Sequence, residues 1–398
     1  MKLLLLLEHH FFRDIKGDVW CERIIDYKYF SRYLSVFDKV YVVARLEYIN
    51  RINRPMKLAS GKGIVFIGLP ECVGPKGLIK KSYSIRRILK RQTDIDCIIL
   101  RAPSPIAMIE YPAVRKLHKP IAVEFVMGAD SMLTKKGILS QIGNKIIDNY
   151  FKRMCRNVEG VSYVTNHILQ QKYPCKYHLK RKGFTESYSS IDLTEESYWR
   201  RNWSEDDRPK QVRMIHVGYM DSYRKGQDIL IYATYELKRK GVNVKLELIG
   251  DGSCRKKLED LVECLGITNL VEFRGALINK DDIVERLKKA HLYVMPTHKE
   301  GLPRGIIEAM AVGLPVISSD VDGIPELIEQ KYMVHKFDYL LYADKIANLI
   351  SNWEEMRRLS ERNYNIALNY KKEKLDEKRK KFYLYLKECA SSNKEETI

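Results

Sequence analysis

Short apolar runs alternate with amphipathic helical patterns along most of the chain, and this alternation restricts the fold more than any other feature. The apolar runs of the first half lie at 2–7, 39–44, 63–67, 97–100, 121–126 and 161–164, with helical patterns near 22–35, 77–91, 105–117 and 132–156. A strand followed by a helix and another strand is the unit that builds parallel sheets. The pattern therefore predicts an α/β protein with doubly wound parallel sheets.

The alternation lapses between residues 185 and 210 and restarts at 213–217. The intervening stretch is rich in Ser, Asp, Glu, Arg and Trp and ends near Pro209, which is typical of a domain boundary. A chain of 398 residues is long enough for about two to three domains. We expect one Rossmann-like domain over 1–200, a second over 201–375, and a C-terminal helix over 376–398 that crosses back to the first domain.

One stretch of the second half combines a strand, a loop and a helix with two glutamates. The run Leu292–Met295 predicts a buried strand, and Ile306–Ala311 predicts a helix closed by Gly313. Glu300 then lies on the loop at the carboxyl end of the strand, and Glu308 lies inside the helix. Ligands of open α/β sheets bind at this edge, where a helix N-terminus offers backbone N–H groups to an anion.

Two carboxylates beside an anion site suit the neutral hydroxyls of a sugar or a ribose, because a carboxylate accepts two hydrogen bonds from a vicinal diol. Gly301 and Gly305 let the backbone approach such a ligand closely. Farther toward the N-terminus, Arg224 and Lys225 precede Gly226 at the start of another predicted helix. Two cations at a helix start suit a diphosphate group, although two solvated basic residues on a loop would look the same.

These motifs resemble those of a known family. Glu300, seven residues, Glu308 and then Ala-Met-Ala-x-Gly-x-Pro-Val resemble the donor-site signature of the retaining glycosyltransferases of family 4. The resemblance is close over most of residues 213–326 and holds in outline elsewhere. It implies a GT-B fold, in which two Rossmann-like domains face a central cleft, an acceptor domain first and a nucleotide-sugar donor domain second.

The resemblance also implies roles for individual residues. Glu308 is expected to hold the donor ribose, Glu300 the transferred sugar, and Lys225, aided by Arg224, the leaving diphosphate. The expected catalytic residues are Glu300, Lys225 and Arg224, and the expected donor-binding residues are Gly218, Gly250, Gly252, Gly301, Leu302, Pro303, Arg304 and Glu308. The family has an arginine directly after the strand's glycine, and Tyr219 stands there in this chain.

In the first domain the polar stretch 8–21 is predicted to be a loop at the ligand-binding edge. We assign His9, His10 and Gly17 within it to acceptor contact, although both histidines also fit a plain surface position. Many relatives have a histidine at the end of the strand equivalent to 121–126, and this chain has none. Glu124 or Asp130 can substitute for it, so the catalytic group of the first domain stays open.

The net charge of +19 is concentrated in the first 200 residues, which hold 35 Lys and Arg against 19 Asp and Glu. Such a field attracts anionic partners, among them nucleic acid, phospholipid headgroups and phosphate-bearing substrates. The run 76–91 combines seven basic residues with apolar ones, which suits either a helix on an anionic membrane or a solvated helix face.

No apolar stretch reaches the ~18 residues of a membrane span, and the eight cysteines form no C-x-x-C pair. We expect a cytoplasmic protein with, at most, peripheral membrane contact.

The prediction that follows is a retaining glycosyltransferase that moves a sugar from a nucleotide-diphosphate sugar to a saccharide or lipid-linked saccharide during cell-surface polysaccharide synthesis. The alternatives are another GT-B activity, either nucleotide-sugar epimerisation or hydrolysis, and a basic nucleic-acid-binding protein. Because nucleic-acid binding leaves the pairing of Glu300 with Glu308 unexplained, we expect no nucleic-acid partner. Two Asp-x-Asp triplets, at 94–96 and 320–322, would suit a metal-dependent enzyme of another fold. The restarting Rossmann pattern favours metal independence and no cofactor.

Overall fold

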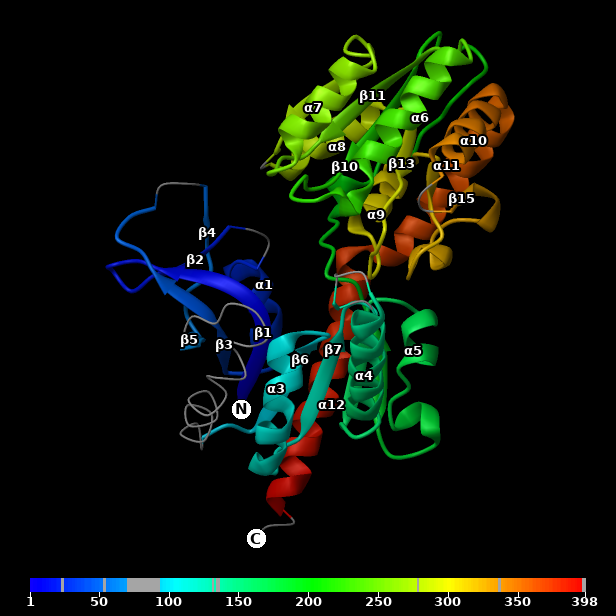
Figure 1. Ribbon diagram of the computed structural model, residues 1–398. Helices are drawn as coiled ribbons and strands as arrows, with labels where there is room; N and C mark the ends of the chain where they lie inside the picture. The colour runs from blue at the N-terminus through cyan, green and yellow to red at the C-terminus, as the bar shows by residue number, and fades with distance from the viewer. Residues whose placement is uncertain are drawn as a thin grey trace. The chain divides into compact units, whose positions relative to one another are not determined.

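The computed structural model describes residues 1–22, 25–52, 55–69, 94–130, 132–133, 137–277, 279–335 and 338–395. By its contacts the chain forms two compact units (Figure 1). The first contains Met1–Tyr188 and Asp376–Ile398, and the second contains Ser189–Leu375. Both units are built on a mainly parallel sheet, as the alternating pattern predicts.

The sheet of the first unit has seven parallel strands in the spatial order β5–β3–β1–β6–β7–β8–β9. They are β1 (Lys2–Arg13), β3 (Lys39–Tyr48), β5 (Ile64–Leu69), β6 (Cys97–Ala102), β7 (Ile121–Phe125), β8 (Gly160–Tyr163) and β9 (Phe184–Ser187). All five leucines from Leu3 to Leu7 are fully buried. A continuous apolar run of this kind is typical of a parallel strand covered on both faces.

Helices cover both faces of this sheet. On one face lie α3 (Pro105–Val114) and α4 (Ile138–Cys155), whose buried side chains share a core with those of β1, β6, β7 and β8. On the other lie α1 (Tyr27–Leu34) and α12 (Lys372–Glu395), which runs behind the strands in the view of Figure 1. The short helix α5 (Ile168–Lys172) follows β8.

The first strand is longer than its sequence predicts, and the prediction of a loop over 8–21 is wrong. β1 continues to Arg13, and a turn then leads into β2 (Val19–Cys21), which pairs antiparallel with β1 and with β4 (Lys57–Leu58). The extension is stable because Phe11 and Phe12 are buried and because Glu8 forms an ion pair with Arg45 of β3 at 2.8 Å. The polar letters that suggested a loop therefore belong to a paired strand.

Glu124, on β7, is buried among tyrosine hydroxyls. The residue is 6% exposed, and its carboxylate accepts hydrogen bonds from Tyr33 (2.7 Å), Tyr383 (2.9 Å) and Tyr188 (3.2 Å). Burial and the nearby carboxylate raise the pKa of Tyr383 well above its ordinary value, so this hydroxyl remains a donor. The hypothesis that Glu124 replaces the first-domain histidine is therefore wrong, because its oxygens fasten α12 to the sheet.

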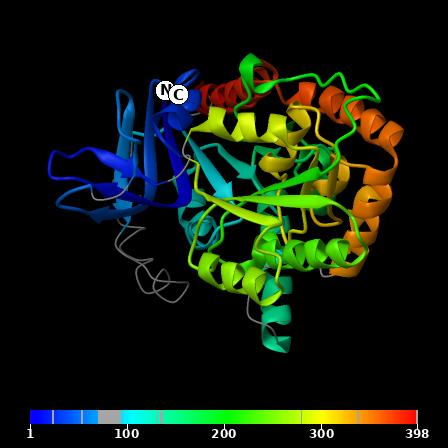
Figure 2. The same ribbon diagram turned by 90° about the horizontal axis from the view of Figure 1, so that it is seen from above.

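The sheet of the second unit is fully parallel, in the order β12–β11–β10–β13–β14–β15. Its strands are β10 (Val212–Val217), β11 (Val244–Ile249), β12 (Val271–Gly275), β13 (Leu292–Met295), β14 (Val316–Ser319) and β15 (Met333–Val334). Its helices are α6 (Gln227–Arg239), α7 (Arg255–Cys264), α8 (Lys280–Lys289), α9 (Arg304–Ala311), α10 (Tyr339–Ser351) and α11 (Trp353–Ala367). Figure 2 shows α6 and α7 along one face of the sheet and α8 and α9 along the other.

A half-buried arginine attaches the start of the second unit to its helices. Arg201 donates to Val312 O (2.7 Å), just after α9, and to Leu287 O (2.7 Å) in the last turn of α8. Its guanidinium lies 5.0 Å and 4.9 Å from the ring centres of Trp199 and Trp203. A cation at two helix C-termini complements the negative ends of both helix dipoles. The segment after Ser189 therefore belongs, by its contacts, to the second unit.

Two expectations from the sequence concern membranes. The predicted helix near 77–91, with its basic run, lies outside the described residues. Within the described ranges, none of the helices has both the length and the apolar content that a membrane span requires.

Replacing Tyr383 by Phe should lower the free energy of unfolding by about 2 kcal/mol, because a hydrogen bond to a buried carboxylate is lost. Urea denaturation at neutral pH measures this change. Tyr177→Phe is the matched control, since Tyr177 is 59% exposed, and it should change stability by less than about 0.5 kcal/mol. Equal effects of the two substitutions would show that Glu124 does not fasten α12.

Candidate functional site

The candidate site lies where the order of the strands reverses. β10 and β13 are neighbours, yet the chain proceeds from β10 through α6 to β11 on one side and from β13 through α9 to β14 on the other. Such a switch point opens a crevice beyond the carboxyl ends of the two strands, where ligands of open α/β sheets bind. The loops that follow these strands carry Lys225 and Glu300.

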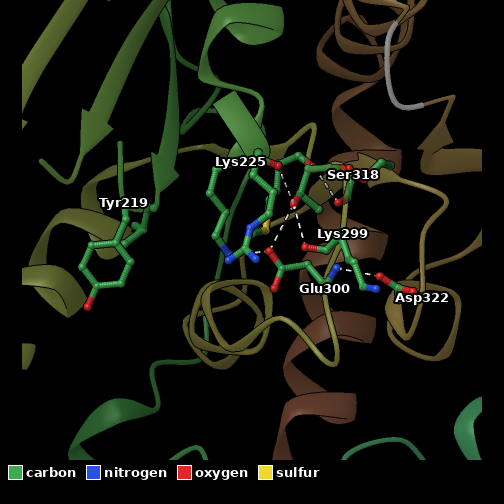
Figure 3. Close-up of polar contacts among 12 residues, drawn as sticks. Tyr219, Lys225, Lys299, Glu300, Ser318 and Asp322 are labelled. Atoms are coloured by element: carbon green, nitrogen blue, oxygen red, sulfur yellow. Dashed lines mark hydrogen bonds and ion pairs between the residues drawn. The ribbon is translucent and has the colours of Figure 1, made fainter. Parts of the chain in front are cut away.

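Lys225 and Glu300 are in contact. The Lys225 ammonium donates to Glu300 Oε1, and the two side chains are 19% and 12% exposed. Figure 3 shows Lys225 extending toward Glu300, with Asp322 on the far side of Glu300 and the Tyr219 ring directed away from this group. The structure thus brings together a cation and a carboxylate that lie 75 residues apart in the sequence. Partial burial makes this pair stronger than an ion pair on an open surface.

The loop that carries Glu300 is held by hydrogen bonds from three sides. Arg224 O accepts from His298 N (2.9 Å) and lies 3.2 Å from Thr297 Oγ1. Asp322 Oδ2 accepts from Glu300 N (2.7 Å), and Ser319 Oγ donates to Thr297 O (2.6 Å). The Glu300 side chain therefore leaves a backbone that the loops after β10 and β14 both fix.

At two glycines the backbone of one loop packs so closely against the backbone of another that a side chain would not fit. A Cβ on Gly226, whose φ is +74°, would lie 1.9 Å from Pro296 O. A Cβ on Gly250, whose φ is +142°, would lie 2.0 Å from Gly218 O. Both distances exclude any side chain, and both φ values favour glycine. The predicted donor-binding residues Gly218 and Gly250 therefore lie against each other, in the loops after β10 and β11.

Glu308 lies in the middle of α9 and is half-buried. Burial, then Glu308 and to a lesser extent Glu300, raise the pKa of Tyr293, whose hydroxyl donates to Val217 O (3.4 Å). Both carboxylates therefore lie close enough to the Tyr293 hydroxyl to affect it, Glu308 from α9 and Glu300 from the loop after β13.

The N-terminus of α9 has no side-chain cap. Its N-cap residue, Pro303, has no side-chain acceptor for a backbone N–H group, and no acidic residue lies in the first turn. By contrast, α10 and α11 are capped by Asp338 and Asn352. The first-turn N–H groups of α9 and its positive dipole end can therefore meet an anion. Arg304, half-buried, begins this turn, and Leu302 beside it is buried.

His216, near the end of β10, is a fully buried histidine that the motifs did not single out. Its Nδ1 lies 2.9 Å from Val294 O, so Nδ1 carries the proton and Nε2 does not. Burial, together with the charge of the neighbouring Lys225, lowers the pKa of His216 to about 4. Among the described residues Nε2 has no hydrogen-bond partner, and a Cβ on Gly218 would lie 2.9 Å from it. His216 therefore remains neutral next to the stem of Lys225.

The remaining donor-site predictions fall at the same edge of the sheet. Arg224 is exposed in a short 3₁₀ turn before α6, and Gly252 packs against the backbone of Asp221. Gly301 O accepts from Gly323 N (3.0 Å), which joins the loops after β13 and β14. Sequence motifs did not identify the supporting residues Thr297, Ser319 and Ser318, whose hydroxyl donates to Met295 O (2.7 Å). Asp322 was noticed as part of an Asp-x-Asp triplet, and it holds Glu300 N instead.

The predicted acceptor residues lie in the first unit. His10 Nε2 is 3.1 Å from Glu47 on β3, and the His9 ring contacts Phe11 edge-on at 4.6 Å between ring centres. Gly17 lies in the turn between β1 and β2 with a φ of +89°. The structure therefore places them on a β-hairpin extension of the sheet.

The carboxylates of the Asp-x-Asp triplets accept hydrogen bonds from backbone N–H groups or form an ion pair with a lysine. Asp96 Oδ2 accepts from Lys2 N (2.7 Å), and Asp94 pairs with the Lys2 ammonium. Over the described parts of the chain, no three His, Cys, Asp or Glu side chains gather as a metal site would require.

The neutral state of His216 predicts a pH-dependent stability. A histidine with a folded pKa near 4 and an unfolded pKa near 6.5 takes up protons more readily in the unfolded chain. Its contribution is complete above pH 6.5 and is lost as the pH falls toward 4. Between pH 7 and 5 the loss should be about 2 kcal/mol.

Urea denaturation at these two pH values measures the loss, which should shrink in His216→Phe. His118→Asn is the control, since His118 is exposed and its left-handed backbone tolerates asparagine. An identical pH dependence in wild type and His216→Phe would contradict the prediction.

Comparisons with known proteins address the same part of the chain. Residues 199–366 match the family model of the glycosyl transferases group 1. Protein CapJ of Staphylococcus aureus is 26% identical over 96% of this chain and 95% of its own length. The putative colanic acid biosynthesis glycosyltransferase WcaL of Escherichia coli is 33% identical over 31% of this chain and 32% of its own.

A solved structure shares the fold. The Anabaena protein HepE in complex with UDP-glucose superimposes with a TM-score of 0.63 at 16% identity, covering 96% of this chain and 98% of HepE. The two Rossmann-like units therefore form a GT-B fold, as the motif resemblance implies. Over residues 199–366, in the second unit, the chain is therefore similar to the glycosyl transferases group 1 family.

Proposed function

We propose that the protein is a retaining hexosyltransferase that moves a sugar from a nucleotide-diphosphate sugar to a saccharide or lipid-linked saccharide in cell-surface polysaccharide synthesis. The observation that carries this proposal is the meeting of Lys225, Glu300 and the uncapped N-terminus of α9 at one switch point. A cation and free N–H groups suit a diphosphate, and a carboxylate beside them suits sugar hydroxyls. The relative WcaL, named for colanic acid biosynthesis, supports the polysaccharide context.

In this proposal each residue at the switch point has one role. Lys225, Arg224 and the first turn of α9, at Arg304, stabilise the charge that grows on the leaving diphosphate. Glu300 accepts hydrogen bonds from the transferred sugar, and Glu308 accepts them from the ribose. When a donor binds, its phosphate oxygens replace Glu300 as the partner of the Lys225 ammonium, and Glu300 becomes available to the sugar.

The acceptor is proposed to bind to the first unit, near His9, His10 and Gly17. These residues extend beyond the carboxyl end of the buried part of β1, the edge at which parallel sheets bind ligands. Asp130 remains a candidate for the first-domain group, and it pairs with Lys172 at 2.7 Å. We also propose that the protein works in the cytoplasm, in peripheral contact with an anionic membrane through the basic first unit, and that it has no nucleic-acid partner.

Transfer is proposed to need no metal ion, because Lys225 and the helix dipole supply the positive charge beside the diphosphate. Activity measured in EDTA should equal activity measured in manganese or magnesium. Loss of transfer in EDTA with recovery on adding manganese would overturn this part of the proposal.

A thermal-shift screen against nucleotide sugars tests the donor directly, since a ligand that binds the native state raises the melting temperature. UDP-glucose belongs in the panel because HepE holds it. The best donor is then incubated with acceptors, and NMR of the product reports the anomeric configuration. Release of free sugar without an acceptor would favour hydrolysis, an altered nucleotide sugar would favour epimerisation, and inversion would refute retention.

Lys225→Met should lower kcat by about 100-fold, because one group that stabilises the departing charge is removed. Steady-state kinetics with the donor found in the screen measure this. Lys288→Met is the matched control: Lys288 forms an ion pair with Glu285 on α8 at 2.8 Å, away from the switch point. If the two variants behaved alike, Lys225 would have no role in transfer.

Substitutions of Glu308 and Glu300 should affect different kinetic constants, KM for Glu308 and kcat for Glu300. Glu308→Gln should raise the donor KM by about tenfold, because charge-assisted hydrogen bonds to the ribose weaken, and it should reduce the thermal shift given by the free nucleoside diphosphate. Glu300→Gln should lower kcat and leave that thermal shift in place. Glu285→Gln on α8 is the control for both. Loss of nucleotide binding in Glu300→Gln would refute its assignment to the sugar.

A further inference from the structure

The helix α4 exposes an unusual amount of apolar side chain. Ile138, Leu139, Ile142 and Ile146, which we call the α4 patch, are 75%, 86%, 52% and 65% exposed. Isolated exposed apolar residues are common on proteins, but four neighbours on one helix form a contiguous surface. Such a surface indicates a contact with something other than water.

The α4 patch lies opposite the side of the helix that packs on the core. Phe151, Met154 and Cys155 face the core cluster of the first unit and are buried. With about 3.6 residues per turn, Ile138, Ile142 and Ile146 fall within an arc of roughly 120° on the other side. The fold of this unit therefore does not need the patch, since its core is complete without these side chains.

The same arc is basic over its C-terminal half. Lys145, Arg153 and Arg156 are exposed there, and none of them forms an ion pair with another described residue. The acidic residue of the helix, Asp148, points inward, where it accepts from the Tyr173 hydroxyl and pairs with Lys152 at 2.7 Å. The exposed face of α4 thus joins an apolar ridge to uncompensated positive charge.

We propose that this face of α4 docks on the surface of an anionic lipid bilayer. Apolar side chains enter the boundary between headgroups and acyl chains while adjacent basic residues meet the negative headgroups. A bilayer accepts such a convex ridge without a complementary shape. The net charge of the first 200 residues, 35 basic against 19 acidic, adds attraction of the same sign.

Two other occupants fit the face less well. In a symmetric contact between two copies, Lys145, Arg153 and Arg156 would lie near their own counterparts, and like charges repel. A protein partner is usually anchored by aromatic residues at the centre of an interface, and the arc contains none. Charge and side-chain chemistry together therefore favour a lipid surface.

The position of α4 connects this surface with the proposed function. The helix begins after β7, on the carboxyl edge of the sheet, where the acceptor is proposed to bind. A bilayer at the α4 patch would hold a lipid-linked saccharide near that edge. This step rests on the proposed lipid-linked acceptor, whereas docking itself does not depend on the reaction.

Co-sedimentation of the full chain with vesicles tests the docking. Vesicles of phosphatidylcholine with about a third phosphatidylglycerol should bind the protein at least tenfold more tightly than phosphatidylcholine alone, and raised salt should weaken binding. Ile138→Gln, Ile142→Gln and Ile146→Gln combined should reduce binding at least tenfold, with an unchanged melting temperature because the replaced side chains are exposed. Lys145→Gln with Arg153→Gln should reduce binding and its salt sensitivity.

The matched control is Leu340→Gln on α10, where Leu340 is 49% exposed in the second unit, and it should bind like the wild type. Failure of the wild type to bind anionic vesicles, or full binding by the triple glutamine variant, would overturn the proposal. So would a dimer in analytical ultracentrifugation that the triple variant abolishes.

Transfer to a soluble saccharide, measured in parallel, separates the two proposals. If vesicle binding is absent and transfer persists, docking is refuted alone. If binding persists and transfer is absent, the proposed reaction is refuted alone.

Discussion

A single backbone carbonyl, that of Arg224, joins the two loops on which the rest of the site depends. It accepts from His298 N and lies within hydrogen-bond distance of Thr297 Oγ1, so the loop after β10 is attached to the loop after β13. Lys225 follows this carbonyl directly, and Glu300 follows Thr297 by three residues. The contact between their side chains is therefore a consequence of backbone bonds, and a donor that separates the two groups need not rearrange the loops that hold them.

Much of the fold was predictable because buried parallel strands have continuous apolar sequences. The strand Leu292–Met295 agrees with the structure residue for residue, since Pro296 ends it. The prediction was wrong where polar residues lie in a strand. Glu8 appeared to end β1, but its carboxylate pairs with Arg45 of β3, and the strand continues to Arg13. Single-sequence periodicity does not reveal such pairing, because the partner lies 37 residues away.

The site was predictable in its charged residues and not in their supports. Spacing identified Glu300 and Glu308, because their separation matches a motif. Asp322 could not be assigned, because a carboxylate that accepts from a backbone N–H looks the same in sequence as one that binds a metal. His216 was missed for a related reason: a histidine within an apolar run gives no sign that its Nε2 lies beside Gly218. Glu124 shows the reverse error, since its position at a strand end suggested chemistry and the tyrosines around it give it a structural role.

Arg201, which joins α8 and α9, also gathers tryptophan side chains around it, and this arrangement affects which part of the protein intrinsic fluorescence reports on. The chain has four tryptophans, and Trp199 and Trp203 lie against the Arg201 guanidinium while Trp203 stacks on Trp353 at 4.9 Å. The fourth, Trp20, belongs to the hairpin of the first unit. Three of the four indoles therefore lie in the second unit, and indole emission originates mainly there. A wavelength shift on denaturation would follow the opening of that unit, and a silent phase would belong to the other.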